Sequence, residues 1–228
     1  MILGIETSDL LCSVAFVNDG RTLAEYNHEI PRQHASLLGI LVEKGVAFLD
    51  SSHLGDQESS NSIDLVAVAL GPGSFTGLRI GLSYAQGFCA AGNIPIIGVS
   101  NHEVLAGYCP YGSETIYTII DARRDEVYLA RLVLNDDKYY DITSHDIVSK
   151  TKLADRIEER SIIIYDRNTI LNEDVIGSLL KKQIIIIDSA KYSAAMTARI
   201  GGVKFKFKGS DNLSDLEPLY IRPFAGIQ

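Results

Sequence analysis

The sequence predicts an α/β protein of two lobes, each built from the same βββαβαβ order of strands and helices. Two observations support this fold class. Short apolar runs alternate with longer amphipathic segments, which is typical of mixed sheets with helices packed on their faces. The order then starts again: an apolar strand that ends in an acid, a turn and a return strand occur at 2–16 and at 117–130. A chain of 228 residues is long enough for two lobes with cores of their own.

The first half contains one complete unit. Apolar or alternating runs predict its strands, and longer stretches with apolar residues three and four apart predict its helices. We expect strands at 2–6, 13–16 and 22–30, a helix at 33–49, a strand at 63–70, a helix at 76–91 and a strand at 95–99. The turn-rich polar segment 51–62 connects the first helix to the strand after it.

The second half repeats this order after a glycine-bearing junction at 107–112. We expect strands at 117–121, 127–130 and 139–145, a helix at 152–159, a strand at 162–165, a helix at 170–180, a strand at 184–187 and a helix at 191–200. The predicted division is a first lobe at 1–108, a smaller second lobe at 109–215 and a tail at 216–228.

The last segment is predicted to be anchored rather than frayed. Tyr220 and Pro223 indicate an extended tail that packs back on the body. Gly201 and Gly202 are expected to cap the end of the last helix. Lysine and phenylalanine alternate at 204–208, which predicts a solvated strand edge.

The composition excludes several classes of protein. The net charge of −8, with no basic face, argues against general adhesion to nucleic acids or membranes. Three cysteines without a Cys-x-x-Cys pair suggest neither a disulfide framework nor a zinc ribbon. No apolar run is long enough for a membrane span, and the first residues lack the basic start of a signal peptide. We therefore expect a cytoplasmic protein with no membrane partner.

The most informative segment is 65–81, in which an apolar strand ends at Gly71-Pro72-Gly73 and a helix begins a few residues later. Ser74 or Thr76 can cap that helix. Strand–turn–helix segments of this kind often bind phosphate at the helix N-terminus. Neither the Walker loop nor the dinucleotide fingerprint fits, because Gly77 is followed by leucine and arginine and Thr76 replaces the third glycine. A tight structural turn is favoured, and phosphate binding remains the alternative.

The duplicated unit resembles the actin, sugar-kinase and Hsp70 (ASKHA) superfamily, in which a nucleotide lies between two lobes. Aligned without a gap, the two hairpins match Ile5 with Ile120 and Glu6 with Asp121. In that superfamily, an acid-bearing hairpin in each lobe holds phosphate and metal. Here Ala122-Arg123 stands where a close backbone approach to phosphate favours glycine. A degenerate cleft is expected, and whether it keeps weak nucleotide affinity stays open.

Four segments carry a closer resemblance: Ile2–Ser8, Gly71–Gly81, Ile120–Tyr128 and Glu217–Pro223. In these segments the chain resembles the TsaB (YeaZ) family, the accessory subunit for making threonylcarbamoyladenosine in tRNA. The resemblance covers the first hundred residues, the second hairpin and the tail. The motif residues are interpreted as structural: Glu6, Thr7, Ser8, Gly71, Gly73, Ser74, Thr76, Arg79, Asp121, Arg123 and Arg124.

The resemblance implies a protein that is not itself the enzyme. The catalytic paralogue TsaD holds its metal with a His-x-x-x-His pair on a helix, and none of the five histidines here forms such a pair. No catalytic residue or metal ligand is therefore assigned. His34 is expected on the surface at the start of the first helix, with its role open. The implied partners are TsaD and the ATPase TsaE, with tRNA only through the complex. No tightly bound cofactor is expected, and ATP is used by the complex.

The helices at 33–49 and 76–91 are the expected partner surface. The first helix is apolar on more than one side, and small residues recur at four-residue spacing on the second. The expected interface residues are Leu37, Leu41, Phe48, Gly77, Gly81 and Ala85. Alone, the chain is expected to form a homodimer through this surface, which TsaD then takes over. The alternative is that the chain's own lobes fill both faces of these helices.

Two other functions are alternatives. The first is a small-molecule kinase of the same superfamily, with Glu6 or Asp121 as a metal or base residue. The second is a peptidase, but neither a Gly-x-Ser-x-Gly elbow nor a His-Glu-x-x-His helix is present. The favoured function is a non-catalytic scaffold that activates a TsaD-type threonylcarbamoyltransferase.

Overall fold

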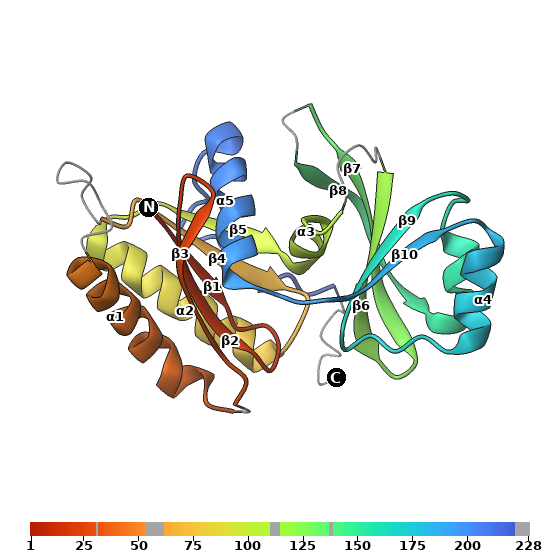
Figure 1. The fold of residues 1–228 in the computed structure, drawn as a ribbon, viewed down its shortest axis with the longest axis horizontal. Helices are drawn as coiled ribbons and strands as arrows, with labels where there is room; N and C mark the ends of the chain where they lie inside the picture. Colours follow the sequence, from red (N-terminus) through yellow and green to blue (C-terminus); the bar gives the residue numbers. More distant parts are fainter. Residues whose placement is uncertain (31, 53–61, 110–114, 137–138, 222–228) are drawn as a thin grey trace. The chain divides into compact units, whose positions relative to one another are not determined.

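Figure 1 shows the computed structural model of the chain, which describes residues 1–30, 32–52, 62–109, 115–136 and 139–221. The chain forms two compact units. Unit 1 comprises residues 1–101 and 192–219, and unit 2 comprises residues 102–191 and the end of the chain from Tyr220. Within the described ranges, no helix combines the length and the apolar composition needed to cross a membrane.

Unit 1 is built on a five-stranded sheet with the strand order β3-β2-β1-β4-β5. Its strands are β1 (Ile2–Glu6), β2 (Cys12–Asn18), β3 (Arg21–His28), β4 (Leu65–Gly71) and β5 (Ile96–Ser100). β1 pairs antiparallel with β2 and parallel with β4, which in turn pairs parallel with β5. The carboxyl ends of β1, β4 and β5 therefore meet at one edge of the sheet, where the glycine turn follows β4.

Helices cover both faces of this sheet (Figure 1). α1 (His34–Ser52) and α2 (Phe75–Gly92) pack on one face, and α5 (Ala194–Lys208) packs on the other. Because successive strand residues point to opposite faces, each strand supplies both layers. Towards α1 and α2 lie Leu3, Ile5, Val14 and Phe16, whereas Ala15 and Val17 contact α5.

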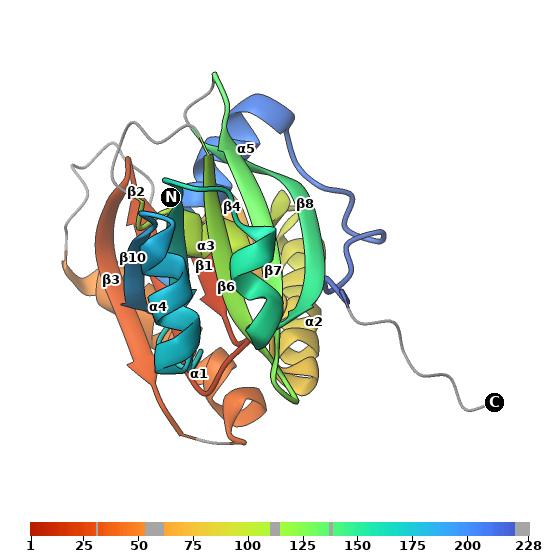
Figure 2. The same cartoon turned by 90° about the vertical axis from the view of Figure 1, so that its right-hand side faces the viewer.

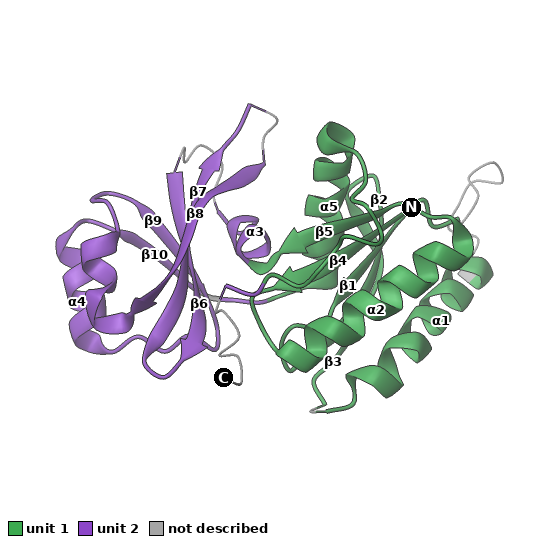
Figure 3. Ribbon diagram, turned by 180° about the vertical axis from the view of Figure 1, so that it is seen from behind, with its two compact units in different colours: residues 1–101, 192–219 green, residues 102–191, 220–228 purple. Residues whose placement is uncertain are grey.

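α5 belongs to unit 1, which corrects the predicted division of the chain (Figure 3). The sequence placed a helix at 191–200 in the second lobe, ended by Gly201-Gly202. Instead, Gly201 lies inside α5, where a Cβ would be 2.5 Å from the Cβ of Ala67 in β4. A Cβ at Gly4 would be 2.0 Å from the carbonyl oxygen of Ala194. Glycines on both elements thus permit a close contact, and 204–208 becomes the last helical turn instead of a strand edge.

Unit 2 is built on a second five-stranded sheet, with the order β10-β9-β6-β7-β8. Its strands are β6 (Thr115–Arg123), β7 (Glu126–Leu134), β8 (Tyr140–Ser149), β9 (Ile162–Asp166) and β10 (Ile185–Ala190). α4 (Glu173–Lys181) lies across one face, with β10 and β8 at the sheet edges (Figure 2). The helix predicted at 152–159 is a short 3-10 helix, η1 (Lys150–Arg156).

The two sheets have the same order when β1 to β5 are matched with β6 to β10, so the predicted duplication is confirmed. The predicted alignment of the hairpins is wrong by one residue. Ile5 packs in the core beneath α1 and α2, and Ile119, not Ile120, packs in the corresponding core of unit 2, so Ile5 corresponds to Ile119. Ile5 pairs with Val14, and Ile119 pairs with Leu129. The second hairpin is one residue longer. Glu6 and Asp121 are therefore not equivalent positions.

The helix that follows each repeat joins the other unit. α3 (Asn101–Ala106), which the sequence analysis missed, follows β5 and leads into unit 2. There Nδ1 of His102 lies 2.8 Å from Oγ1 of Thr118 in β6. α5 follows β10 and packs on the first sheet. The described boundary between the units thus lies after Asn101, before the junction predicted at 107–112.

Three predicted segments lie partly or wholly outside the described residues: the connector at 51–62, the junction at 107–112 and the end of the tail with Pro223. Residues 213–219 pack on unit 1, where the N–H of Leu219 donates to the carbonyl oxygen of Leu70 at 2.8 Å. Nε2 of Gln86 donates to the carbonyl oxygens of Leu213 and Leu216 at 2.8 and 3.1 Å.

The contact between β1 and α5 makes a stability prediction. Gly4→Ala should destabilise unit 1 by about 1–3 kcal/mol, because the new methyl group meets backbone atoms that cannot rotate away. Gly87→Ala is the matched control, since nothing lies within 4 Å of a Cβ there and alanine favours helix by up to about 1 kcal/mol. Urea unfolding followed by circular dichroism measures both. Equal stability of the two variants would contradict the observed packing of α5.

Candidate functional site

The segment after β4 folds as the strand, turn and helix that the sequence predicts. Gly71 has a φ of +91°, a conformation that favours glycine. Ser74 is the N-cap of α2, and its Oγ accepts a hydrogen bond from the N–H of Gly77 at 3.3 Å. The alternative cap, Thr76, lies inside the first turn of the helix.

The glycines of this segment pack against the chain's own Thr7–Ser8 backbone. A Cβ at Gly73 would lie 2.5 Å from the carbonyl oxygen of Ser8, and one at Gly77 would lie 2.0 Å from that of Thr7. At Gly81, a Cβ would lie 2.2 Å from Oγ1 of Thr7. The glycines therefore leave space for the chain's own Thr7–Ser8 segment, at the position where a phosphate-binding loop would leave space for its ligand.

Hydrogen bonds fix this contact. The N–H of Ser74 donates to the carbonyl oxygen of Ser8 at 2.6 Å. The hydroxyl of Thr7 donates to the carbonyl oxygen of Gly77 at 2.8 Å. The N–H of the N-cap residue Ser74 and the N–H of Gly77 are thus both used within unit 1. These bonds support the structural interpretation of Thr7, Ser8 and the glycines.

Glu6 is fully buried at the end of β1. Its Oε1 accepts a hydrogen bond from the N–H of Ser8 at 2.5 Å, and its Oε2 has no hydrogen-bond partner among the described residues. Burial raises the pKa of Glu6 to about 7, because its effect is larger than the opposing effect of the hydrogen bonds from Ser8. A carboxyl group in this setting is half-protonated near neutral pH and is held by the same turn that packs on α2.

Asn101 completes this network, and the sequence analysis missed it. Its Nδ2 donates to Oγ of Ser8 at 2.6 Å and to the carbonyl oxygen of Pro72 at 2.9 Å. It links the end of β1 to the glycine turn. Its position directly after β5 could have indicated this role, because residues that follow neighbouring parallel strands meet at one sheet edge.

The predicted interface residues are only partly exposed, which requires a correction. Leu41, Gly77, Gly81 and Ala85 are buried within unit 1, and Leu37 is half-buried against the same core. The four-residue spacing on α2 therefore faces the sheet instead of forming an outward ridge. Of the predicted set, Phe48 is exposed, with 45% of its surface accessible.

Other apolar side chains are exposed on these two helices. Ile40 on α1 and Phe75 on α2 are 46% and 39% exposed. Arg79 is the one charged residue among the 18 of α2, and its guanidinium carbon lies 3.8 Å from the centroid of the Phe75 ring. The outer face of α2 is therefore almost uncharged, which is unusual for a helix surface that remains in water.

The turn after β6 is held by contacts within unit 2. Arg123, Arg124 and Asp125 have φ values of +64°, +51° and +65°. Asp121 accepts a hydrogen bond from the N–H of Arg123 at 3.2 Å and forms an ion pair with Lys150 at 3.2 Å. Both arginine side chains are exposed. The contacts of Asp121 support its interpretation as a structural residue.

The histidines are dispersed. His34 is buried at the start of α1, not exposed as predicted, and its Nε2 has no hydrogen-bond partner among the described residues. Burial lowers the pKa of His102 to about 3, so this side chain is neutral. His53 lies outside the described residues. In the described part of the chain, no group of three or more histidine, cysteine or acidic side chains is arranged to hold a metal ion.

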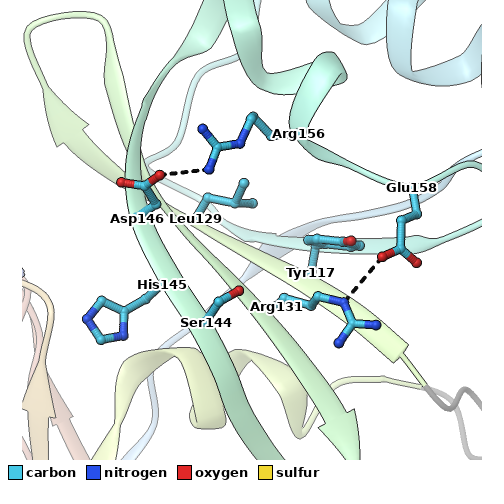
Figure 4. Close-up of a pocket in the computed structure, with 8 residues that line it drawn as sticks. All are labelled: Tyr117, Leu129, Arg131, Ser144, His145, Asp146, Arg156 and Glu158. Carbon is cyan, nitrogen blue, oxygen red and sulfur yellow. Dashed lines mark hydrogen bonds and ion pairs between the residues drawn. The ribbon is translucent and has the colours of Figure 1, made fainter.

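Unit 2 has a shallow hollow of about 330 Å³ on the sheet face beside η1 (Figure 4). Two ion pairs lie in it: Arg156 with Asp146 at 2.7 Å, and Arg131 with Glu158 at 3.4 Å. Tyr117 contributes to its lining. Each of these arginines is neutralised by a carboxylate of the same unit, and none of the predicted motif residues lines the hollow. The candidate site is therefore the carboxyl edge of the first sheet with its helices α1 and α2.

A family model described as "TsaD: tRNA N6-adenosine threonylcarbamoyltransferase" matches residues 29–202. The TsaB protein of Haemophilus influenzae, named for tRNA threonylcarbamoyladenosine biosynthesis, is 25% identical over 97% of this chain and 93% of its own length. The TsaB protein of Escherichia coli is 32% identical over 70% of this chain and 67% of its own length.

A solved structure agrees with these sequence matches. It is a Pseudomonas aeruginosa protein described as similar to peptidase YeaZ, with a TM-score of 0.74 and 25% identity. The match covers 97% of this chain and 99% of that one. The chain therefore belongs to the TsaB (YeaZ) family, within the wider group that the TsaD model describes.

Proposed function

We propose that this chain acts in tRNA threonylcarbamoyladenosine biosynthesis as a non-catalytic accessory subunit of a TsaD-type transferase. The observation that carries the proposal is the occupied glycine turn. Thr7 and Ser8 fill the space in front of Gly73 and Gly77, where a phosphate-binding loop would hold its ligand. The same contact is evidence against the kinase alternative, because it occupies that space. ATP is then used by the assembled complex, with the ATPase TsaE, rather than by this chain.

The outer face of α1 and α2 is the proposed binding surface. The two helices lie side by side, and a Cβ at Gly39 of α1 would be 3.6 Å from the ring of Tyr84 in α2. Ile40, Phe48 and Phe75 expose apolar area on this pair. Interface centres are poor in charged residues and rich in aromatic side chains. The exposed surface of α2 has this composition, whereas α1 also exposes Glu43 and Lys44 between Ile40 and Phe48. The composition of α2 supports burial of its outer face against another protein.

Common ancestry with TsaD supports a TsaD-type protein as the partner. The TsaD family model spans both α1 and α2, so a TsaD-type protein has an equivalent helix pair to offer. Two related helix pairs can pack through a pseudo-two-fold contact, and two copies of this chain can use the same face. We propose a homodimer in the absence of TsaD and a heterodimer in its presence, with tRNA bound only by the complex.

Charges placed on this face should weaken binding to the TsaD protein of the same organism. Ile40→Glu and Phe48→Glu should each cost about 2 kcal/mol, the loss typical of a central interface residue. Isothermal titration measures the affinity. Threonylcarbamoyl transfer to tRNA, reconstituted with TsaD, TsaE, ATP and threonylcarbamoyl-adenylate, should fall with it.

Phe207→Glu on α5 is the matched control, because Phe207 is 53% exposed on unit 1 but lies outside α1 and α2. It should bind TsaD like the parent. Wild-type affinity of both the Ile40 and Phe48 variants, with circular dichroism showing the native fold, would place the interface elsewhere.

Glu6 should matter for stability and not for the reaction. Its folded-state pKa of about 7 exceeds the usual 4.5, so the folded chain loses stability as pH rises through this window. Glu6→Gln avoids that loss and should be more stable than the parent at pH 8, by up to about 3 kcal/mol. The difference should vanish near pH 5. Chemical unfolding at the two pH values measures it.

The same Glu6→Gln variant separates structure from catalysis. In the reconstituted reaction it should support tRNA modification as the parent does. A large loss of modification by a variant that remains folded and bound to TsaD would assign Glu6 to the chemistry and contradict the accessory role.

A further inference from the structure

The turn between β6 and β7 carries residues that its backbone does not favour. Arg123, Arg124 and Asp125 follow one another with φ values of +64°, +51° and +65°. Side chains other than glycine are disfavoured in this left-handed region, and two-residue hairpin turns with positive φ favour Asn-Gly or Asp-Gly. The shape of the turn therefore does not explain why two arginines stand in it.

Contacts within unit 2 hold the backbone of this turn in place. The carboxylate of Asp121 accepts a hydrogen bond from the N–H of Arg123 and forms an ion pair with Lys150, both at 3.2 Å. The N–H of Lys150 donates to the carbonyl oxygen of Asp125 at 2.9 Å. These contacts use Asp121, Lys150 and backbone groups, and they leave both guanidinium groups out.

The side chains of Arg123 and Arg124 are exposed. Neither guanidinium has a hydrogen-bond or ion-pair partner among the described residues. Residues in disfavoured backbone conformations concentrate at functional sites, where the side chain is needed in spite of the backbone. A fixed turn that presents two unpaired guanidinium groups to solvent therefore indicates contact with an anionic group outside the chain.

The surroundings of the turn favour phosphate as this group. Segment 149–152 lies beside the turn through the Lys150 hydrogen bond, and it adds the exposed side chains of Thr151 and Lys152. Residues 121–126 and 149–152 carry four cationic and three acidic side chains, against 21 and 29 in the whole chain. None of the large apolar side chains exposed on the described chain lies in these two segments. Protein interfaces have an apolar centre, whereas nucleic-acid phosphates are contacted by arginine, lysine and hydroxyl groups.

We infer that Arg123 and Arg124 contact backbone phosphates of the tRNA when this chain is assembled with TsaD. A guanidinium binds phosphate oxygens through two parallel N–H bonds. Such contacts position a nucleic acid and carry no sequence information. This inference rests on the proposed function, because it names the part of the chain that the tRNA reaches in the complex.

Removal of both guanidinium groups tests the inference. The double variant Arg123→Asn with Arg124→Asn should keep the turn, because asparagine adopts positive φ more readily than most residues. Assembled with TsaD and TsaE, it should bind an unmodified tRNA transcript about tenfold more weakly near about 0.1 M salt. The slope of log affinity against log salt should fall by about one to two. Fluorescence anisotropy of labelled tRNA measures both quantities. Lysine at both positions should retain most of the affinity, because an ammonium still neutralises a phosphate.

Arg160→Asn is the matched control. Arg160 is also exposed and has a φ of +59°, but its Nε donates to Oε1 of Gln183 at 3.0 Å. It precedes β9, which runs parallel to β6, so it lies at the opposite end of these strands from the turn. This variant should bind tRNA like the parent. Circular dichroism of all variants verifies the fold.

The remaining outcomes separate the sources of the anion. Parent-like tRNA binding by the folded double variant overturns the inference. Weaker binding to TsaD with unchanged tRNA binding would assign the arginines to a carboxylate of the partner, and weaker ATP binding alone would assign them to a nucleotide phosphate. Either result also overturns it. If the parent chain forms no complex with TsaD, or the complex binds no tRNA, the proposed function fails together with the inference.

Discussion

The contact between the Thr7–Ser8 backbone and the glycines at the start of α2 is the constraint on which the rest of unit 1 depends. It joins the end of β1 to the helix that follows β4, and it closes at distances that leave no space for a Cβ at Gly73 or Gly77. Glu6 and Asn101 are held by the same turn. Because this contact fixes the position of α2, it also determines which face of α2 points outward beside α1. Local close packing thus determines which surface the unit presents.

The same contact supports the proposed accessory role. A helix N-terminus after a glycine turn offers N–H groups that an anion can use. Here Ser8 and the Ser74 hydroxyl accept two of these hydrogen bonds, so the chain itself takes the place of a ligand. In the proposed function, the chemistry of the wider group belongs to a related partner, and the helix pair α1 and α2 binds that partner. The low charge of α2 is consistent with that role.

The order of strands and helices along the chain could be predicted from the sequence, because the same alternation of strands and helices occurs twice. The unit to which α5 belongs could not be predicted, because nothing in the sequence of a helix that follows β10 indicates that Gly4 lies opposite it. Four-residue spacing predicted that Gly77, Gly81 and Ala85 share one side of α2, but spacing alone does not say whether that side faces the sheet. Likewise, the glycine turn predicted a close approach without identifying Thr7 and Ser8 as the group that approaches.

Because the chain itself fills the glycine turn, this turn is expected not to bind nucleotide phosphates. The most direct measurement is a titration of the isolated chain with ATP and Mg²⁺, followed through the backbone amide signals of Gly71, Gly73, Ser74, Thr76 and Gly77. The account predicts that these signals stay unchanged while nucleotide reaches millimolar concentrations. Saturable shifts confined to these amides would show that the turn still opens to phosphate, and would contradict the account.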